Sequence, residues 1–310
     1  MKKFAFVFPG QGSQSVGMMQ AFTGTDVVRS VFAEASEILG EDLWKLVSEG
    51  PTEALNSTVN TQPAMLVAGY AVYRAWIDAG GSEPAIVAGH SLGEYTALVV
   101  SGAISFQDAV PLVRFRAEAM QAAVPLGTGA MAAILGLDDD AVRKACRDGA
   151  GAEVVEAVNF NAPSQVVIAG HKGAVERAGA AAKAAGAKRA LPLPVSAPFH
   201  SSLLEPAAER LAAYLANVRV EPLHIPLVNN VDVAIVSEPE AIRQALARQA
   251  RSPVRWVEVV RSMASQGVTD VVECGPGKVL AGLTRRIAPG VHGHALTDPQ
   301  SLSQIMEVLR

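Results

Sequence analysis

The apolar positions of this chain fall into short continuous runs separated by longer amphipathic stretches. Phe4–Phe8 and residues 85–88 are uninterrupted apolar runs, each followed by a turn containing glycine or proline, which is typical of buried strands. Helical periodicity follows each of them, and the alternation returns near the C-terminus. Strands that alternate with helices indicate a mostly parallel sheet covered on both faces, so the chain is assigned to the α/β class. The further elements predicted outside the middle of the chain are helices at 27–39, 64–79, 108–121, 203–216, 239–249, 254–265 and 279–287, a helix from about Glu94, and strands at 225–228 and 270–273.

The middle of the chain has a different order of elements. Its pattern predicts strand, helix, two strands, helix and strand, the order of a ferredoxin-like unit. This unit begins after the glycines at 127 and 129 and ends at the prolines at 192 and 194. We therefore expect a small domain at 128–194, inserted into a catalytic domain made of 1–127 and 195–310. The predicted elements of the small domain are strands at 131–137, 153–159, 165–169 and 188–193, and helices at 138–147 and 174–185.

Composition narrows the classes of function. The 310 residues are 50% apolar and 18% charged, with a net charge of −4, enough to build a full core and too acidic for a nucleic-acid-binding protein. Cys146 and Cys274 lie far apart with no CxxC motif, so we expect neither a zinc site nor disulfides, and a reducing compartment. The first apolar run ends at Pro9, too soon for a signal peptide, and none reaches the roughly 20 residues of a membrane helix. We expect a cytoplasmic protein without metal, nucleic-acid or membrane binding.

The sharpest chemical motif is Gly89-His90-Ser91-Leu92-Gly93, a G-x-S-x-G between a predicted strand and a predicted helix. Such a tight turn strains its central residue and exposes the serine hydroxyl at a helix N-terminus, where free N–H groups can hold an anion. A glycine-rich turn that contains serine by chance is the alternative. With these flanks, the motif favours Ser91 as a nucleophile on an α/β-hydrolase-like core.

A serine nucleophile needs a base, and His200 is the strongest of six candidates. It follows the return of the chain from the small domain and precedes a predicted helix, so it is able to face Ser91. An α/β-hydrolase would carry an acid between the serine and the histidine, but the acids in that interval lie on helix faces or in the small domain. The pattern therefore indicates a dyad. The weaker candidates are His90, expected to point away from Ser91, His171 at a helix start, His224 before a strand, and His292 and His294 in a late loop.

Arg116 bears on the substrate. In the predicted helix 108–121 it shares the apolar stripe with Ala109, Val113 and Met120. A partly buried guanidinium keeps its charge and needs an anionic partner. That partner is either a nearby acid, or solvent reached by the long side chain, or a substrate carboxylate held by two hydrogen bonds.

These motifs, with several others, resemble one enzyme family over essentially the whole chain. The matching segments are Phe8–Gln14, Gly89–Tyr95, Arg116, Asn159-Phe160-Asn161, Ser196–His200, Arg248-Gln249, Ser252–Val254 and Glu273–Lys278. In order and spacing they are similar to those of the malonyl-CoA:acyl-carrier-protein transacylase family of type II fatty-acid synthesis.

The resemblance implies a role for each matching residue. Ser91 would form a malonyl ester, and His200 would act as base and then as acid. The backbone N–H groups of Gln11 and Leu92 would form the oxyanion hole, and Arg116 would bind the malonyl carboxylate. Gln62 and Asn161 would support the pocket, and the main-chain carbonyl of Gln249 would hold the second imidazole nitrogen. Ordinary structural roles are the alternative for three of them: a turn at Gln11, a helix cap at Gln62, and a hairpin turn at Asn161.

The resemblance also implies the reaction partners. Malonyl-CoA would be the donor substrate, the phosphopantetheine of a transiently bound acyl carrier protein the acceptor, and no cofactor would be tightly bound. Because carrier proteins are acidic, basic residues at Lys188, Arg189, Lys278, Arg285 and Arg286 are candidates for docking. The alternatives are a free-standing polyketide acyltransferase, a malonate-decarboxylase subunit, a serine hydrolase, or a non-catalytic binding protein.

Overall fold

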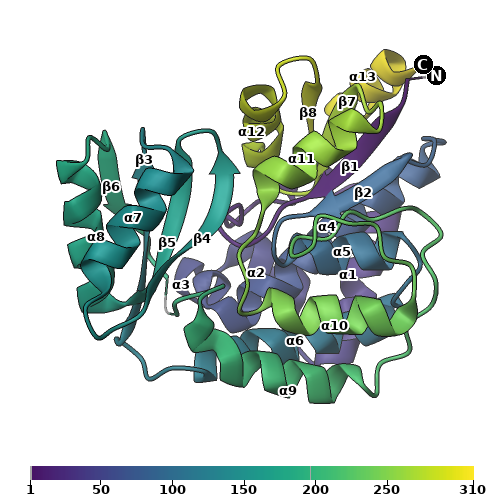
Figure 1. The fold of residues 1–310 in the computed structure, drawn as a ribbon. Helices are drawn as coiled ribbons and strands as arrows, with labels where there is room; N and C mark the ends of the chain where they lie inside the picture. Colours follow the sequence, from purple (N-terminus) through teal and green to yellow (C-terminus); the bar gives the residue numbers. More distant parts are fainter. Residues whose placement is uncertain (1, 196) are drawn as a thin grey trace.

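The computed structural model describes residues 2–195 and 197–310; Ser196, part of the motif that ends at His200, lies outside the described residues. The described chain contains two separate four-stranded sheets (Figure 1). The first is parallel, in the order β2-β1-β7-β8. Its strands are β1 (Phe4–Phe8), β2 (Ile86–Gly89), β7 (Asp270–Cys274) and β8 (His292–Leu296).

Helices cover both faces of the parallel sheet. Along β1 the side chains alternate: Phe4, Phe6 and Phe8 face one core, and Ala5 and Val7 face another. The first core is closed by the helices seen below the sheet in Figure 1 and by α13, and the second by α11 and α12. The helices outside the second sheet are α1 (Asp26–Leu39), α2 (Leu43–Glu49), α3 (Thr52–Asn56), α4 (Thr58–Asp78), α5 (Gly93–Val100), α6 (Phe106–Ala122), α9 (Glu205–Leu215), α10 (Pro239–Gln249), α11 (Trp256–Ser265), α12 (Val279–Ile287) and α13 (Pro299–Leu309), with short 3-10 turns at Gln20–Phe22 and Ser202–Leu204.

The second sheet is antiparallel, with the order β4-β5-β3-β6. Helices α7 and α8 cover one face, where Val142 and Val175 pack on Ile134 and Ile168. The other face carries a smaller apolar cluster that includes Met131 and Phe199. The elements of this unit are β3 (Gly129–Leu135), α7 (Asp139–Ala150), β4 (Val155–Ala162), β5 (Gln165–His171), α8 (Lys172–Ala184) and β6 (Arg189–Pro192).

Edge strand β4 joins the two sheet units. Phe160 N donates to Val254 O at 3.0 Å, and Val254 N donates to Val158 O at 2.8 Å. Val254 lies in the short segment between α10 and α11. From the other side, the guanidinium of Arg286 on α12 donates to Gln165 Oε1 and to the carbonyl of Pro163, in the β4–β5 turn. The turn and the edge of the antiparallel sheet are therefore tied to the unit that carries the parallel sheet.

Most of the predicted elements are confirmed within a few residues, and two expectations are wrong. Residues 225–228 do not form a strand; Leu227 makes only an isolated bridge to Val87. His292 and His294 lie in strand β8, not in a loop, because this edge strand pairs with β7 along five residues in spite of Gly293. No helix in the described part of the chain is long and apolar enough to cross a membrane.

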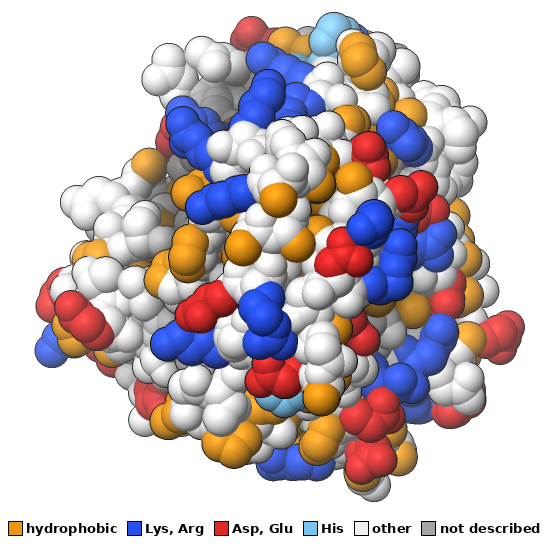
Figure 2. Space-filling view, turned by 60° about the vertical axis from the view of Figure 1, so that its left-hand side comes forward, with side chains coloured by type: hydrophobic (Ala, Val, Ile, Leu, Met, Phe, Trp, Pro, Cys, Tyr) orange, Lys and Arg blue, Asp and Glu red, His pale blue; other side chains and the backbone are white. Residues whose placement is uncertain are grey.

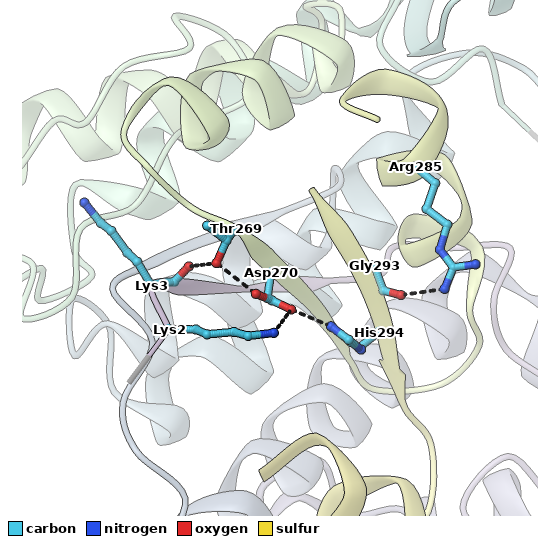
Figure 3. A network of polar contacts seen from close by, with 7 residues as sticks. All are labelled: Lys2, Lys3, Thr269, Asp270, Arg285, Gly293 and His294. Atoms are coloured by element: carbon cyan, nitrogen blue, oxygen red, sulfur yellow. Dashed lines mark hydrogen bonds and ion pairs between the residues drawn. The ribbon is translucent and has the colours of Figure 1, made fainter. Parts of the chain in front are cut away.

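A buried carboxylate ties the start of β7 to the N-terminus and to β8 (Figure 3). Asp270 accepts hydrogen bonds from His294 Nε2 at 2.8 Å and from Thr269 Oγ1 at 2.8 Å, and Lys2 Nζ lies 3.4 Å away. Burial acts to raise the pKa of Asp270, but the hydrogen bonds of His294 and Thr269 and the charge of Lys2 hold it below its usual range. The network lies at the amino ends of the parallel strands.

Asp270→Asn is expected to lower the free energy of unfolding by about 1–3 kcal/mol near neutral pH, because a buried charge-assisted hydrogen bond is lost. A carboxylate with a lowered folded pKa stabilises the protein above its unfolded pKa of about 3.9, and this contribution is lost as the pH falls through the folded pKa. Urea denaturation should therefore show the difference between wild type and variant shrinking below about pH 4. A difference of constant size from pH 7 to pH 3 would contradict this assignment.

Candidate active site

Ser91 lies in the tight turn between β2 and α5, with a backbone φ of 52°. This left-handed conformation is unusual for a residue with a side chain, and it is sustained by close backbone packing on both sides. A Cβ at Gly89 would meet the carbonyl carbon of Gly93 at 1.8 Å, and a Cβ at Gly93 would meet Phe8 O at 2.0 Å. Only glycine fits at either position, which explains the spacing of the G-x-S-x-G motif.

His200 meets Ser91, as the sequence predicts. Ser91 Oγ lies 2.7 Å from His200 Nε2, and His200 Nδ1 lies 2.9 Å from the carbonyl oxygen of Gln249. A carbonyl only accepts, so Nδ1 carries the proton and Nε2 is free to accept one from the serine. Burial first and then the charge of Arg116 lower the pKa of His200 to about 3, so the imidazole is neutral at pH 7. The ring is oriented by a backbone carbonyl, and within the described chain neither ring nitrogen is hydrogen-bonded to an acid.

Arg116 on α6 enters the same site and is 2% exposed, which rules out the solvent-facing alternative. Its Nη1 donates to Gln62 Oε1 at 2.6 Å, and its Nη2 donates to Gln249 Oε1 at 2.9 Å and to Ser91 Oγ at 3.1 Å. All three acceptors are neutral. Burial lowers the pKa of Arg116, but guanidinium remains charged near neutral pH. The buried cation therefore has only neutral hydrogen-bond acceptors within the described chain.

Gln11 and Leu92 both line the cavity beside Ser91. The backbone N–H groups of these two residues have no hydrogen-bond partner in the part of the chain that the structure describes, so both can donate to a ligand. The side chain of Gln11 is held separately: its Oε1 accepts from Thr58 Oγ1 at 2.7 Å, and Thr58 in turn accepts from Gln62 Nε2 at 3.2 Å. Gln11 is thereby linked to Arg116 through Gln62.

The predicted pocket residue Asn161 lies one step further out. Its Oδ1 lies 2.8 Å from His90 Nε2, and His90 lines the cavity whereas Asn161 does not. Asn159, two residues earlier on β4, lies in the cavity wall. The cavity measures about 490 Å³ and is bounded by both sheet units; besides the residues already named, it is lined by Gly12, Gln14, Asn56, Met120, Met131, Leu193, Pro194, Val195 and Phe199. It is large enough for an acyl thioester arm.

Two features around Ser91 were missed by sequence reasoning. Asn230 bonds the backbone on both sides of His90, and the side chain of Gln249, whose carbonyl alone was predicted to matter, bonds Ser91 O and Arg116. The only signal for Asn230 was a pair of polar residues, 229 and 230, directly after the apolar segment 225–228. That pattern alone predicts a turn and no particular partner.

Comparison with known proteins agrees with this geometry. Residues 5–289 match the family model described as the acyl transferase domain. The chain belongs to this acyl transferase family.

The acyl transferase is 56% identical to the malonyl CoA-acyl carrier protein transacylase of Escherichia coli (strain K12), over 99% of this chain and 100% of that protein. Its fold matches the crystal structure of the acyl-carrier-protein S-malonyltransferase from Burkholderia pseudomallei 1710b with a TM-score of 0.97 and 64% identity, covering 99% and 100% of the two chains. It also matches, with a TM-score of 0.98 and 53% identity over 99% and 100%, a malonyl-transacylase solved in complex with its type II PKS acyl-carrier protein. The acyl transferase thus has the mixed α/β fold, with one parallel and one antiparallel sheet, that these relatives share.

Proposed function

We propose that this acyl transferase moves the malonyl group of malonyl-CoA to the phosphopantetheine thiol of an acyl carrier protein, as its relatives' names describe, and supplies fatty-acid synthesis. One observation carries the choice of acyl group. Arg116 is a buried cation whose hydrogen-bond acceptors are all neutral, and it lies within 3.1 Å of the nucleophile Ser91. A carboxylate-bearing acyl chain on Ser91 would place its negative charge within reach of this guanidinium.

The first half-reaction begins when Ser91 Oγ gives its proton to His200 Nε2 and bonds to the thioester carbonyl carbon. The carbonyl oxygen becomes an oxyanion that accepts hydrogen bonds from the N–H groups of Gln11 and Leu92. When this intermediate collapses, the carbon–sulfur bond breaks and coenzyme A leaves as a thiolate, which takes the proton from His200. Because burial, together with the charge of Arg116, lowers the pKa of His200 to about 3, its imidazolium gives up the proton readily.

The second half-reaction reverses these steps with a different thiol. His200 accepts the proton of the phosphopantetheine thiol, the sulfur attacks the malonyl ester, and Ser91 leaves with the proton returned by His200. Water is the competing nucleophile. The side chains of Arg116, Gln62 and His200, which line the cavity beside Ser91, are almost fully buried, so they limit the access of water to the ester from that side. Gln249 O keeps His200 in one tautomer throughout.

The proposal is tested by intact mass spectrometry of the purified protein mixed with malonyl-CoA or acetyl-CoA, followed by addition of holo acyl carrier protein. A malonyl adduct on Ser91 that disappears as malonyl-carrier protein forms is the expected result. An adduct that decays equally fast without the carrier would indicate a serine hydrolase. No adduct at any concentration would contradict the proposal outright.

A polyketide acyl carrier protein is a second candidate for the acceptor of the malonyl group. The relative solved with its type II PKS acyl-carrier protein is 53% identical to this chain, so a polyketide carrier is also chemically suited to the same site. Comparing the transfer rates to fatty-acid and polyketide carrier proteins separates the two acceptors, because the loading step with malonyl-CoA is common to both. A faster transfer to the polyketide carrier would assign the enzyme to that pathway.

The proposed function is assigned to a chain of two domains. We infer an α/β-hydrolase-like catalytic domain at 1–127 and 195–310, and a ferredoxin-like domain at 128–194. The former is supported by the tight G-x-S-x-G turn at residues 89–93, called the elbow from here on, which follows a strand of the parallel sheet. The sheet order β4-β5-β3-β6 supports the latter, since it is second-third-first-fourth in chain order. We place the reaction in the cytoplasm, where the free buried thiols of Cys146 and Cys274 remain reduced.

Carrier-protein docking requires basic side chains that are free to meet acidic partners. In Figure 2, basic side chains gather in the upper left of the face shown, and basic and acidic side chains mix over the rest. Arg286 is a poor probe, because it ties α12 to the β4–β5 turn. Lys278 is exposed beside Val279, whose side chain is 52% exposed, and is better suited.

Lys278→Glu is expected to raise KM for carrier protein by roughly 10-fold at low salt, since attraction to an acidic partner becomes repulsion. Malonyl loading from malonyl-CoA should stay within a factor of about 2 of wild type, because Lys278 lies outside the cavity wall around Ser91. Steady-state kinetics of each half-reaction at two salt concentrations provides the measurement. Equal loss in both half-reactions would discredit the docking role, and Lys278→Gln serves as the neutral control.

A further inference from the structure

We infer that Glu94 is a positioning residue that sets the geometry of Ser91 and Arg116 through two amides, Asn230 and Gln249. This inference rests on the proposed acyl transfer and concerns how its nucleophile is held. Glu94 lies in the first turn of α5, three residues after Ser91, and is 2% exposed. Its backbone N–H donates to the carbonyl of Ser91 at 3.1 Å, but within the described chain its side chain makes no hydrogen bond to Ser91 or His200.

Asn230 holds the elbow from one side. Its Oδ1 accepts the backbone N–H of Ser91 at 2.8 Å, and its Nδ2 donates to the carbonyl of Gly89 at 2.7 Å. The two bonds bracket the residue before the nucleophile, so they fix the peptide planes on which the left-handed conformation of Ser91 depends. Asn230 comes from a segment 139 residues away in the chain, which means that its own position has to be set by something else.

Gln249 holds the elbow from the other side. Its Nε2 donates to the carbonyl of Ser91 at 3.0 Å, and its Oε1 accepts from Arg116 Nη2 at 2.9 Å. The main-chain oxygen of the same residue accepts from His200. One glutamine therefore contacts the nucleophile, the cation and the base, and its side chain is useful only when the amide has the right orientation.

Glu94 reinforces that orientation and links the two amides. A single oxygen, Oε2, accepts from the backbone N–H of Asn230 at 2.9 Å and from Gln249 Nε2 at 3.0 Å. Arg116 can only donate, and a carboxylate oxygen without a proton can only accept, so Gln249 must turn its NH₂ group toward Glu94 and its oxygen toward Arg116. If Glu94 were removed, the amide would lose one of the three contacts that set its direction, the others being Arg116 and the carbonyl of Ser91, and the buried N–H of Asn230 would lose its acceptor.

The bonds from Asn230 and Gln249 to Glu94 depend on the position of its Oε2 atom more than on the charge of its carboxyl group. Burial raises the pKa of Glu94 to about 7, against the opposing hydrogen bonds of Gln249 and Asn230 and the charge of Arg116, while Asp232 adds to the rise. In either protonation state the carboxyl group keeps an oxygen that accepts hydrogen bonds. A glutamine at position 94 can therefore replace the acceptor, whereas an aspartate keeps the charge and withdraws the oxygen by one methylene group.

The test is the single-turnover rate at which malonyl-CoA acylates Ser91, followed by rapid quench and intact mass. Glu94→Asp and Glu94→Ala are expected to lower the maximal acylation rate about 100-fold, the loss typical of a misplacement near 1 Å, with half-saturation by malonyl-CoA changed by less than about 3-fold. Glu94→Gln is expected to stay within about 5-fold of wild type. Asp270→Asn is the matched control, because it removes a buried carboxylate at the opposite ends of the strands and should leave acylation unchanged.

The results distinguish a wrong role for Glu94 from a wrong proposed function. A fast Glu94→Asp with a slow Glu94→Gln would show that charge is what matters and would overturn the inference, as would an alanine variant that acylates at the wild-type rate. If the alanine variant does not fold, the comparison of aspartate with glutamine still decides. Failure of wild-type enzyme to form any malonyl adduct would contradict the proposed function instead, before any variant is compared.

Discussion

Ser91→Ala is expected to lower the malonyl transfer rate by about 10⁵–10⁶-fold and to leave no malonyl adduct on the protein. The rate is expected to fall this far because covalent catalysis is lost altogether, as when the nucleophile of a serine protease is removed. Ser91 Oγ lies 2.7 Å from His200 Nε2, and Ser91 carries the only hydroxyl among the described residues that line the cavity. Stopped reactions analysed by intact mass and by carrier-protein gel shift provide the measurement.

Binding of malonyl-CoA to the Ser91→Ala variant is the control for this loss of activity. Ser91→Ala keeps Arg116, Gln62 and Gln249 in place, so malonyl-CoA should still bind with nearly unchanged affinity in calorimetry. A variant that still accumulates an acyl-protein adduct would identify another nucleophile. In that case the hydrogen bond between Ser91 and His200 would have no part in covalent chemistry.

Arg116→Ala is expected to remove the preference for malonyl over acetyl groups, because kcat/KM falls about 10²–10³-fold further for malonyl-CoA than for acetyl-CoA. Acylation by both thioesters also slows, since Arg116 donates to Ser91 Oγ and to Gln249 Oε1. A charge-assisted pair of hydrogen bonds to the malonyl carboxylate is lost, and this contribution is absent for acetyl. The guanidinium lies too deep for solvent to replace it, being 2% exposed. Competition between the two thioesters in one reaction measures the ratio directly.

Arg116→Lys is the matched variant, because it keeps the charge but loses the planar fork that meets Gln62 and Gln249 together. We expect it to recover part of the malonyl preference. If Arg116→Ala left the ratio of malonyl to acetyl transfer unchanged, the assignment of the carboxylate site would be wrong, even with Ser91 and His200 fully active.

Local chemistry explains why part of this site could be predicted from the sequence. The elbow is encoded in five consecutive residues, and each glycine is required by a backbone contact within a few residues or on the adjacent strand β1. Arg116 was recognisable because a charged residue interrupts the apolar stripe of its helix, with Ala109, Val113 and Met120 all buried around it. Such signals depend on neighbours close in the chain.

The features of the site and fold that the sequence did not predict depend on contacts between segments far apart in the chain. Asn230 and Gln249 reach Ser91 from 139 and 158 residues away, and nothing in their own neighbourhood indicates a partner. The same applies to the fold: β8 was missed because Gly293 and two histidines weaken its strand pattern, and only pairing with β7 forms the strand. Residues 225–228 had a strong strand pattern, but the chain leaves the sheet edge after a single bridge to Val87.

The two backbone hydrogen bonds between β4 and Val254 limit where chimaeras of this enzyme can be joined. Val254 lies five residues after Gln249, whose carbonyl orients the imidazole, and His200 stands where the chain leaves the antiparallel unit. Exchanging that unit for the one in a relative would therefore shift the imidazole of His200 and the carbonyl of Gln249 at once. Chimaeras that cross over on either side of the antiparallel unit need to bring residues 195–200 and 249–254 along as one cassette.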